Sequence, residues 1–358
     1  MCGNCRIFPK IYQTLNTKVT SQFEGQNLET LLLTDDEVKK LLSIGEVMEA
    51  VESAFREKGL GHVQMPAKIY LFYKKYNGDL RTMPSYLEEL DVSAVKIVNV
   101  HPDNRTKYNL PTVMAVIVLI DPKSGAPIAI MSGTTVTDMR TGAAGGIAAK
   151  YLARNNSKIV GLIGAGAQAK TQLMALLEVY GKLEEVRVWS RSKETKQKFV
   201  AETEPAYGHL CKITSVETIN EAVKGADIVV TTTPSRKPLV TNDMVSLGMH
   251  FNCIGADAPG KEELDPAILK RAKIVVDDWE QASHSGEINV PLSQGMITKE
   301  NVRMEIGEIV AGLKPSRERQ NEITIFTSTG LAVQDAVTAK IAYKKAIDKG
   351  IGRLIKIT

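Results

Sequence analysis

The chain has 358 residues, 43% of them hydrophobic and 24% charged, a composition typical of a globular protein with room for two domains. The net charge is +4 with both signs interspersed, so nothing in the charge pattern suggests nucleic-acid binding. No apolar run reaches the roughly 18 residues that a membrane-spanning helix needs. The N-terminus also lacks the pattern of a secretory signal, and we therefore expect a cytoplasmic protein that does not engage a membrane.

The four cysteines are too few to predict a disulfide framework in a chain of this length. Cys2 and Cys5 have the CxxC spacing of half a zinc site, but no second CxxC or paired-His motif supplies the missing ligands. A thioredoxin-like redox pair would follow a strand and open a helix. We therefore expect reduced thiols on an N-terminal extension, residues 1–30, and no metal site.

The first part of the chain predicts two helices and a sheet. Thr34, with Glu37 three residues later, forms a capping box and marks the start of one helix. A second helix is expected at residues 43–58, where apolar residues recur at helical spacing. Strand patterns follow at residues 68–73, 79–82, 93–98, 112–120 and 126–131, the last two joined by a turn at 121–125. This arrangement favours a mixed or antiparallel sheet with helices on one side.

The pattern changes near residue 133, where a helix rich in Ala and Gly is expected over residues 134–155. Its small residues from 142 to 153 suggest close packing against another helix. Helical segments then alternate with short apolar strands at residues 159–163, 186–189, 228–232, 251–254 and 274–276. Such alternation is typical of a parallel, doubly wound sheet. A last helix, residues 331–348, is expected to return to the first domain.

These patterns predict an α/β protein in which a Rossmann doubly wound parallel sheet is joined to a second, α+β domain. The expected boundaries are an extension over 1–30, the α+β domain over 31–135 with a C-terminal return over 330–358, and the Rossmann domain over 136–329.

A glycine-rich loop predicts where a dinucleotide binds. Gly164, Gly166 and Ala169 fit G-x-G-x-x-G/A directly after a strand and at the start of a helix, which is the context that the motif requires. Gly164 permits a tight turn, and Gly166 lets the backbone approach the pyrophosphate. Ala167 and Gln168 begin the helix whose free N–H groups face the phosphates. An ordinary strand–turn–helix built from small residues is the alternative reading.

The loop after the next strand bears on the choice of cofactor. An enzyme that uses NAD typically ends this strand with Asp or Glu, which binds the ribose 2′-hydroxyl. Here Ser190, Arg191 and Ser192 follow the strand, and they could hold a 2′-phosphate instead. We therefore favour NADP(H), with NAD(H) as the alternative, in which case Arg191 is a solvated loop charge.

Several motifs taken together resemble the ornithine cyclodeaminase and mu-crystallin family, which includes archaeal-type alanine dehydrogenases. The resemblance extends from about residue 30 to the end. Besides the glycine loop, the motifs lie at residues 65–68, 81–86, 95–102, 137–144, 255–261 and 328–335. The resemblance implies a homodimer formed through the N-terminal sheets and an active site between the two domains. It also implies hydride transfer at the α-carbon of an amino or imino acid.

The resemblance assigns roles to five charged residues. Lys68, Arg81 and Arg140 match positions around the substrate, where cations hold its carboxylate. Lys96 lies in an apolar strand, where burial and nearby cations would lower its pKa into the range of a proton donor. Asp257 follows a strand of the doubly wound sheet, near the nicotinamide, and could bind the substrate ammonium or accept a proton. The plainer readings are a solvent-facing Lys96, a surface Arg81 and an Asp257 that caps its loop.

The sequence therefore predicts an NAD(P)-dependent oxidoreductase acting on the CH–NH2 or C=N group of a small amino or imino acid, of the alanine dehydrogenase or cyclic ketimine reductase type. Ornithine cyclodeaminase, which forms proline and ammonia, is one alternative. Arg81 weakens it, because ornithine cyclodeaminases typically have a Glu there and a cation would repel a second ammonium. An NADPH-binding protein like mu-crystallin, with catalysis secondary, is the other alternative.

Overall fold

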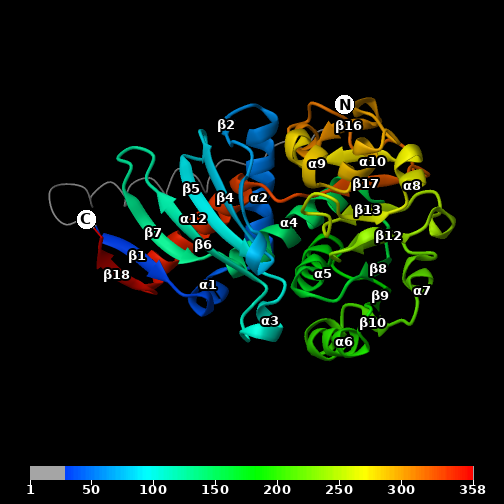
Figure 1. Ribbon diagram of the computed structural model, residues 1–358, viewed down its shortest axis with the longest axis horizontal. Helices are drawn as coiled ribbons and strands as arrows, with labels where there is room; N and C mark the ends of the chain where they lie inside the picture. Colours follow the sequence, from blue (N-terminus) through cyan, green and yellow to red (C-terminus); the bar gives the residue numbers. More distant parts are fainter. Residues whose placement is uncertain (1–28, 358) are drawn as a thin grey trace, which may run out of the picture.

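The computed structural model describes residues 29–357, which form two large sheets joined by helices (Figure 1). The Cys2/Cys5 pair and almost all of the expected extension lie outside the described residues. The first sheet is on the left of Figure 1 and the second on the right. Within residues 29–357, no helix combines the length and apolar character needed to cross a membrane.

The first sheet contains the strands from the two ends of the described chain. They are β1 (Glu29–Leu33), β2 (Val63–Gln64), β3 (Ile69–Tyr73), β4 (Gly78–Leu87), β5 (Val92–Val100), β6 (Val113–Ile120), β7 (Pro127–Ser132) and β18 (Arg353–Lys356). Their order is β18-β1-β7-β6-β5-β4-β2, and β3 also pairs with β4. Only the β1–β7 pair is parallel, so the predicted mixed or antiparallel sheet is confirmed, as is the β6–β7 hairpin. Strands β1 and β18, which pair with each other, were not predicted.

The second sheet is parallel throughout. Its strands are β8 (Ile159–Ile163), β9 (Glu185–Trp189), β10 (Lys212–Ser215), β11 (Ile228–Thr231), β13 (His250–Cys253), β15 (Lys273–Val276), β16 (Val302–Glu305) and β17 (Thr324–Thr327). Their order is β10-β9-β8-β11-β13-β17-β15-β16, which confirms the doubly wound Rossmann sheet. The strand order reverses between β8 and β11, the place where ligands of such sheets bind. Two short strands, β12 (Arg236–Val240) and β14 (Glu262–Leu264), pair beside this sheet.

Twelve α-helices lie in the described part of the chain. They are α1 (Asp35–Leu41), α2 (Ile44–Gly59), α3 (Asn104–Lys107), α4 (Thr134–Leu152), α5 (Ala167–Tyr180), α6 (Lys193–Tyr207), α7 (Ile219–Val223), α8 (Pro266–Arg271), α9 (Trp279–Ser285), α10 (Asn289–Ser293), α11 (Ile306–Val310) and α12 (Ala332–Lys349). Short 3-10 turns occur at Lys74–Tyr76, Asn242–Met244 and Lys299–Asn301. The capping box that predicted α1 is present: Thr34 accepts from the Glu37 N–H, and the Glu37 carboxylate accepts from the Thr34 N–H at 2.8 Å.

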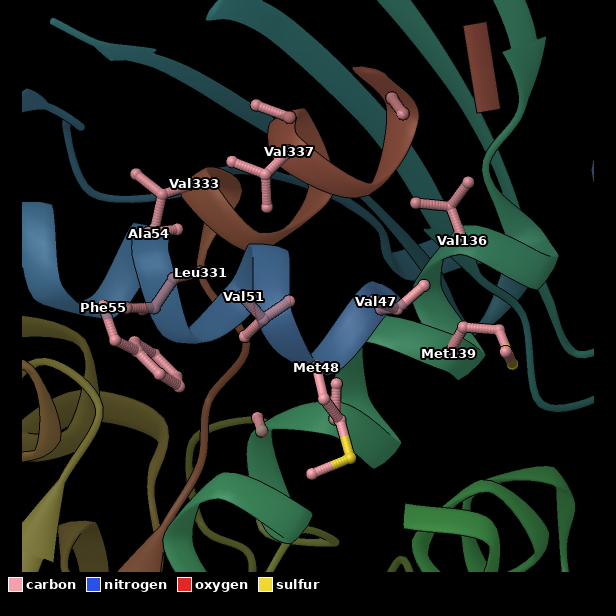
Figure 2. Close-up of a cluster of buried hydrophobic side chains, with 14 of the residues drawn as sticks. Val47, Met48, Val51, Ala54, Phe55, Val136, Met139, Leu331, Val333 and Val337 are labelled. Carbon is pink, nitrogen blue, oxygen red and sulfur yellow. The ribbon is translucent and has the colours of Figure 1, made fainter. Parts of the chain in front are cut away.

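Helices α2, α4 and α12 connect the two sheets. They meet in a buried apolar cluster that includes Val47 and Val51 of α2, Val136 of α4 and Val337 of α12 (Figure 2). A fully buried Val side chain contributes about 1.5–3 kcal/mol relative to an exposed one. This cluster therefore holds the first sheet, on which α12 packs, firmly against the helix that leads into the second sheet.

The small residues of α4 allow α5 to approach closely, as predicted for residues 142–153. A Cβ atom added to Gly142 would lie 2.5 Å from the backbone oxygen of Thr171 in α5. A Cβ on Gly146 would lie 2.8 Å from the side chain of Ala175 in the same helix. Both separations are shorter than van der Waals contact, so only glycine fits.

Candidate active site between the two sheets

Charged side chains from both sheets meet at the carboxyl ends of the parallel strands. The first sheet contributes Arg81 from β4 and Lys96 from β5, and both side chains are buried. Arg140 comes from α4, and Lys68 precedes β3. Facing these cations are three aspartates: Asp257 four residues after β13, Asp277 directly after β15, and Asp335 in the first turn of α12. The structure therefore brings all five predicted charged residues together and adds Asp277 and Asp335.

Lys96 is the most enclosed cation of the site, because only 1% of its surface is exposed. Its Nζ lies 2.7 Å from Oδ2 of Asp335, whose Oδ1 accepts from Nε of Arg140 at 2.9 Å. Burial, together with the charge of Arg140, lowers the pKa of Lys96 to about 7, although Asp335 opposes this shift. Lys96 can therefore gain or lose a proton near neutral pH, as the work of a general acid or base requires.

Asp257 is held between two cations. Its Oδ2 lies 3.1 Å from Nη1 of Arg81, and its Oδ1 lies 2.5 Å from Nζ of Lys261. Burial alone would raise the pKa of Asp257, but Lys261 and Arg81 outweigh it and hold the pKa well below its ordinary value. Asp257 is therefore ionised at neutral pH, which suits it to attract a substrate cation better than to remove a proton.

Arg81 is bound on both sides by carboxylates. Besides Asp257, it contacts Asp79 through Nε at 2.8 Å and through Nη2 at 3.2 Å. This paired geometry fixes the guanidinium plane, which also lies over the ring of Tyr70 with 5.2 Å to its centroid. Arg81 is thus largely committed to protein partners, which was not expected of a residue predicted to bind the substrate carboxylate.

Lys68 and Asp277 meet the turn after β17. Nζ of Lys68 donates to the backbone oxygen of Thr329 at 2.5 Å, while Asp277 accepts from the N–H groups of Thr329 at 2.6 Å and Gly330 at 2.8 Å. Burial lowers the pKa of Lys68 to about 8, with Arg81 and Arg140 acting in the same direction and Asp277 against them. Burial likewise raises the pKa of Asp277 to about 6. Asp277 follows a strand of the Rossmann sheet just as Asp257 does, and that position could have identified it.

The glycine loop has the geometry that a dinucleotide needs. Gly164 has a φ of +112°, and its missing Cβ would collide with the Thr232 side chain, so only glycine fits the turn. A Cβ on Gly166 would meet open space, which leaves the backbone approachable where α5 begins. Ala167 is the first residue of that helix. These features fit a pyrophosphate placed against the free N–H groups of a 14-residue helix.

Gln168 links the glycine loop to α4, the helix that carries Arg140. Its Nε2 donates to Oδ1 of Asp138 at 2.7 Å. Burial raises the pKa of Asp138 to about 6, although the nearby Arg140 opposes this. The side chain of Gln168 is thus held by α4, while its backbone N–H lies in the first turn of α5, where the prediction places the phosphates.

The loop after β9 is more open than the rest of the site. Arg191 is exposed, and Ser190 is half-buried. Ser192 caps α6, where its hydroxyl accepts from the Thr195 N–H at 3.2 Å and donates to Glu194 at 2.7 Å. One of the two predicted serine hydroxyls is therefore already used within the protein.

The fold and this site define an oxidoreductase that binds a nicotinamide dinucleotide at a Rossmann sheet. The chain belongs to the ornithine cyclodeaminase/mu-crystallin family, whose model matches residues 28–350. An alanine dehydrogenase from Archaeoglobus fulgidus is 52% identical over 329 residues, 92% of this chain and 99% of that protein. The fold, the family and the class of enzyme predicted from the sequence are thus confirmed.

Two solved structures are similar over nearly the whole length. One is an archaeal alanine dehydrogenase dimer with bound NAD, with a TM-score of 0.88 and 51% identity, covering 92% of this chain and 100% of that chain. The other is Thermococcus litoralis Delta(1)-pyrroline-2-carboxylate reductase in complex with NADH and L-proline, with a TM-score of 0.88 and 43% identity, covering 91% and 100%.

Proposed function

We propose that this protein interconverts a small α-amino acid and its imine, as an alanine dehydrogenase or a cyclic ketimine reductase. The observation that carries the proposal is the buried Lys96, whose Nζ contacts Asp335 at 2.7 Å and whose pKa lies near 7. The relatives that act on alanine or on a cyclic imine support the same class of substrate. The division into a Rossmann domain over 136–329 and a substrate and dimerisation domain over 31–135 and 330–358 belongs to this proposal.

The role proposed for each charged residue follows from the donor atoms or the charge that its protein partners leave available to the substrate. Arg140 uses Nε and Nη1 for Asp335 and Gln334, and we assign Nη2, with Lys68, to the substrate carboxylate. Asp257, kept ionised by Arg81 and Lys261, attracts the amino or iminium group. Arg81, which is paired with Asp79 and Asp257, then acts mainly by orienting Asp257.

Lys96 moves the proton. In the oxidative direction, the neutral amine of Lys96 accepts a proton from the substrate ammonium, so that the nitrogen lone pair can form the C=N bond. In the reductive direction, the Lys96 ammonium returns a proton to that nitrogen. The nicotinamide, when bound, supplies or takes the hydride at the α-carbon. Where the imine is acyclic, water adds to it, and collapse releases ammonia and the 2-oxo acid.

For the cofactor, we propose a preference for NADP(H). Arg191 is exposed beside Ser190, and no carboxylate ends β9, so a 2′-phosphate would meet a cation and a hydroxyl. NAD(H) is the second candidate, because the two similar solved structures hold NAD or NADH. In addition, the hydroxyl of Ser192 donates to the carboxylate of Glu194, so this serine is already paired with an acid and is less suited to a phosphate.

We also propose that the protein is a homodimer formed through the outer face of the first sheet. Along β6, the buried Ala115, Ile117 and Leu119 face α12, while Met114 and Val116 point to the other side. Val116 is 45% exposed, and with neighbours from β1 and β7 it lines an apolar cavity of about 480 Å³. Exposed apolar surface of this kind is typical of an interface. The similar archaeal alanine dehydrogenase is a dimer.

An assay with three substrates tests the function. The purified protein is given NADPH or NADH with pyruvate and ammonia, then with pyrroline-2-carboxylate, and finally NAD with ornithine. Oxidation of the cofactor with pyruvate and ammonia identifies an alanine dehydrogenase, and oxidation with the cyclic imine alone identifies a ketimine reductase. Proline formed from ornithine, with both other arms silent, would show that the interpretation of Arg81 is wrong.

A further inference from the structure

Two glutamates with no role in the proposed reaction are fully buried behind the Asp257 loop. Glu263 lies in β14, and Glu287 follows the end of α9; neither exposes any surface. Burying a carboxylate is costly unless it is paired or hydrogen-bonded, so two of them side by side call for a physical reason.

Glu263 ties together the loops that follow two neighbouring strands. Its Oε1 accepts from the N–H and from the hydroxyl of Thr233, both at 2.7 Å, and Thr233 follows β11. Its Oε2 accepts from the N–H of Gly255 at 3.0 Å, and Gly255 follows β13. Three donors from two loops thus converge on a single carboxylate.

Both loops belong to the wall of the cofactor site. Thr232, next to Thr233, is the residue that packs against Gly164 of the glycine loop. Gly255 accepts from the N–H of Asp257 at 3.0 Å, and a Cβ on Gly255 would lie 2.5 Å from Oε2 of Glu263. The glycine at this position thus lets the carboxylate approach the backbone that carries Asp257.

Glu287 holds the backbone of β14, the strand that carries Glu263, through hydrogen bonds. Its Oε1 accepts from the backbone N–H groups of Glu263 at 2.7 Å and Leu264 at 2.6 Å. Its Oε2 has no hydrogen-bond partner among residues 29–357. Burial raises the pKa of both glutamates, but the donors on Glu263 oppose the rise there, while the charge of Glu263 raises the pKa of Glu287 further. Of the two carboxyl groups, Glu287 therefore holds a proton more firmly than Glu263.

We propose that Glu263 is a positioning residue for hydride transfer: its carboxylate fixes the Thr233 and Gly255 loops as one wall of the nicotinamide site and so sets the position of Asp257. The proposal rests on the proposed function. A carboxylate suits the task, because it accepts from both loops through two oxygens. An amide of the same size has only one acceptor oxygen and presents N–H groups to the other loop.

Two matched substitutions test the proposal. Glu263→Gln removes one acceptor from the clamp, whereas Glu287→Gln replaces the carboxyl that holds a proton more firmly by a neutral amide and keeps the oxygen that accepts from Glu263 and Leu264. We expect Glu263→Gln to lower kcat by about 10- to 100-fold, through misplaced reacting groups, and to increase the primary isotope effect with 4-deuterated cofactor. We expect Glu287→Gln to keep both values within about twofold of the wild type, with unfolding temperatures recorded for both.

A readout independent of turnover separates this proposal from the proposed function. With NADH or NADPH bound, hydrogen exchange should quicken in residues 232–236 and 254–261 of Glu263→Gln and stay unchanged in Glu287→Gln. If Glu263→Gln fails to fold, Thr233→Val serves instead, because it removes the hydroxyl that donates to Glu263. It should lower kcat and quicken hydrogen exchange in the same residues, but to a smaller extent. Wild-type kcat and exchange in the Glu263 or Thr233 variants, or equal losses in Glu263→Gln and Glu287→Gln, would overturn the proposal. A wild-type protein that turned over none of the substrates would contradict the proposed function. The hydrogen-exchange measurements would then test by themselves whether Glu263 fixes the two loops.

Discussion

Asp335 and Lys96 form a buried ion pair of 2.7 Å between the first turn of α12 and the middle of β5. The same carboxylate holds Arg140 at 2.9 Å, so one acid orients both the proposed proton carrier and the proposed carboxylate ligand. Asp335 raises the pKa of Lys96 against the effects of burial and of Arg140. It therefore tunes the lysine as well as holding it in place.

Replacing Asp335 should shift the pH profile as well as reduce the rate. In Asp335→Asn, the loss of the negative charge should lower the pKa of Lys96 below about 7, so less of the ammonium form is present at neutral pH. We expect reductive kcat to fall by about 10²- to 10⁴-fold, the range typical of general acid–base catalysis, with its alkaline limb moved to lower pH. A reduced rate with an unmoved limb would show that Asp335 serves folding only. Asp348→Asn, near the far end of α12, is the control.

The two reaction directions should respond oppositely to pH. The pKa of Lys96 is lowered from 10.5 to about 7, so its ammonium form is lost as the pH rises through about 7. Reduction needs that form and should slow above this pH, whereas oxidation needs the neutral amine and should quicken. Initial rates in both directions from pH 5.5 to 9 measure this. Lys96→Met should leave only residual activity, and its rate should not change with pH near 7. If that pH dependence persisted in Lys96→Met, it would arise from the titration of another group.

The orientation of Lys96 illustrates what the sequence could and could not predict. Apolar residues occupy both faces of β5: Ala94 and Val98 share the inner face with Lys96, while Val95 and Ile97 lie on the other. Because neither face is polar, alternation alone could not say which way the lysine points; the family motif supplied that. The structure settles it, since α12 packs over the inner face.

The partners of the predicted residues were harder to find than the residues themselves. Asp335 ends the 328–335 motif, but its pairing with Lys96 and Arg140 joins segments that lie far apart in the sequence. No local pattern encodes such a pairing. The strands β10 and β17 were missed because polar residues at their ends leave only a short apolar run in each. The long helices and the glycine loop were predicted, because periodicity and turn chemistry are local.

Neutralising Asp257 should separate catalysis from cofactor binding. Asp257→Asn removes the charge that attracts the substrate cation, and also releases Arg81 and Lys261. We expect turnover to be lost, while the Kd for NADPH or NADH, measured by nicotinamide fluorescence, stays within about threefold. The exposed Asp243, changed to Asn in the same half of the protein, should behave as the wild type. Wild-type rates in Asp257→Asn would remove this residue from the mechanism.

Cofactor choice can be tested at the loop after β9. If Arg191 holds the 2′-phosphate, Arg191→Ala should raise the KM for NADPH by about 10- to 100-fold, the value of a lost charge-assisted hydrogen bond. The KM for NADH should change by less than about twofold, since that cofactor lacks the phosphate. Arg319→Ala, at a cation with 80% of its side chain exposed, controls for surface charge. Equal effects on both cofactors would mean that the 2′-phosphate is not bound by Arg191.

The outer face of the first sheet offers a test of the proposed dimer. Val116→Glu places a charge at the centre of the strand β6, where dimerisation would bury it without a partner. We expect the variant to sediment as a monomer at concentrations where the wild type is a dimer. Leu313→Glu, at another exposed apolar residue, should leave the assembly unchanged. A Val116→Glu variant that stayed dimeric would place the interface elsewhere. In that case, burial between two subunits could not explain why β5 carries apolar residues on its outer face as well as on the face that contains Lys96.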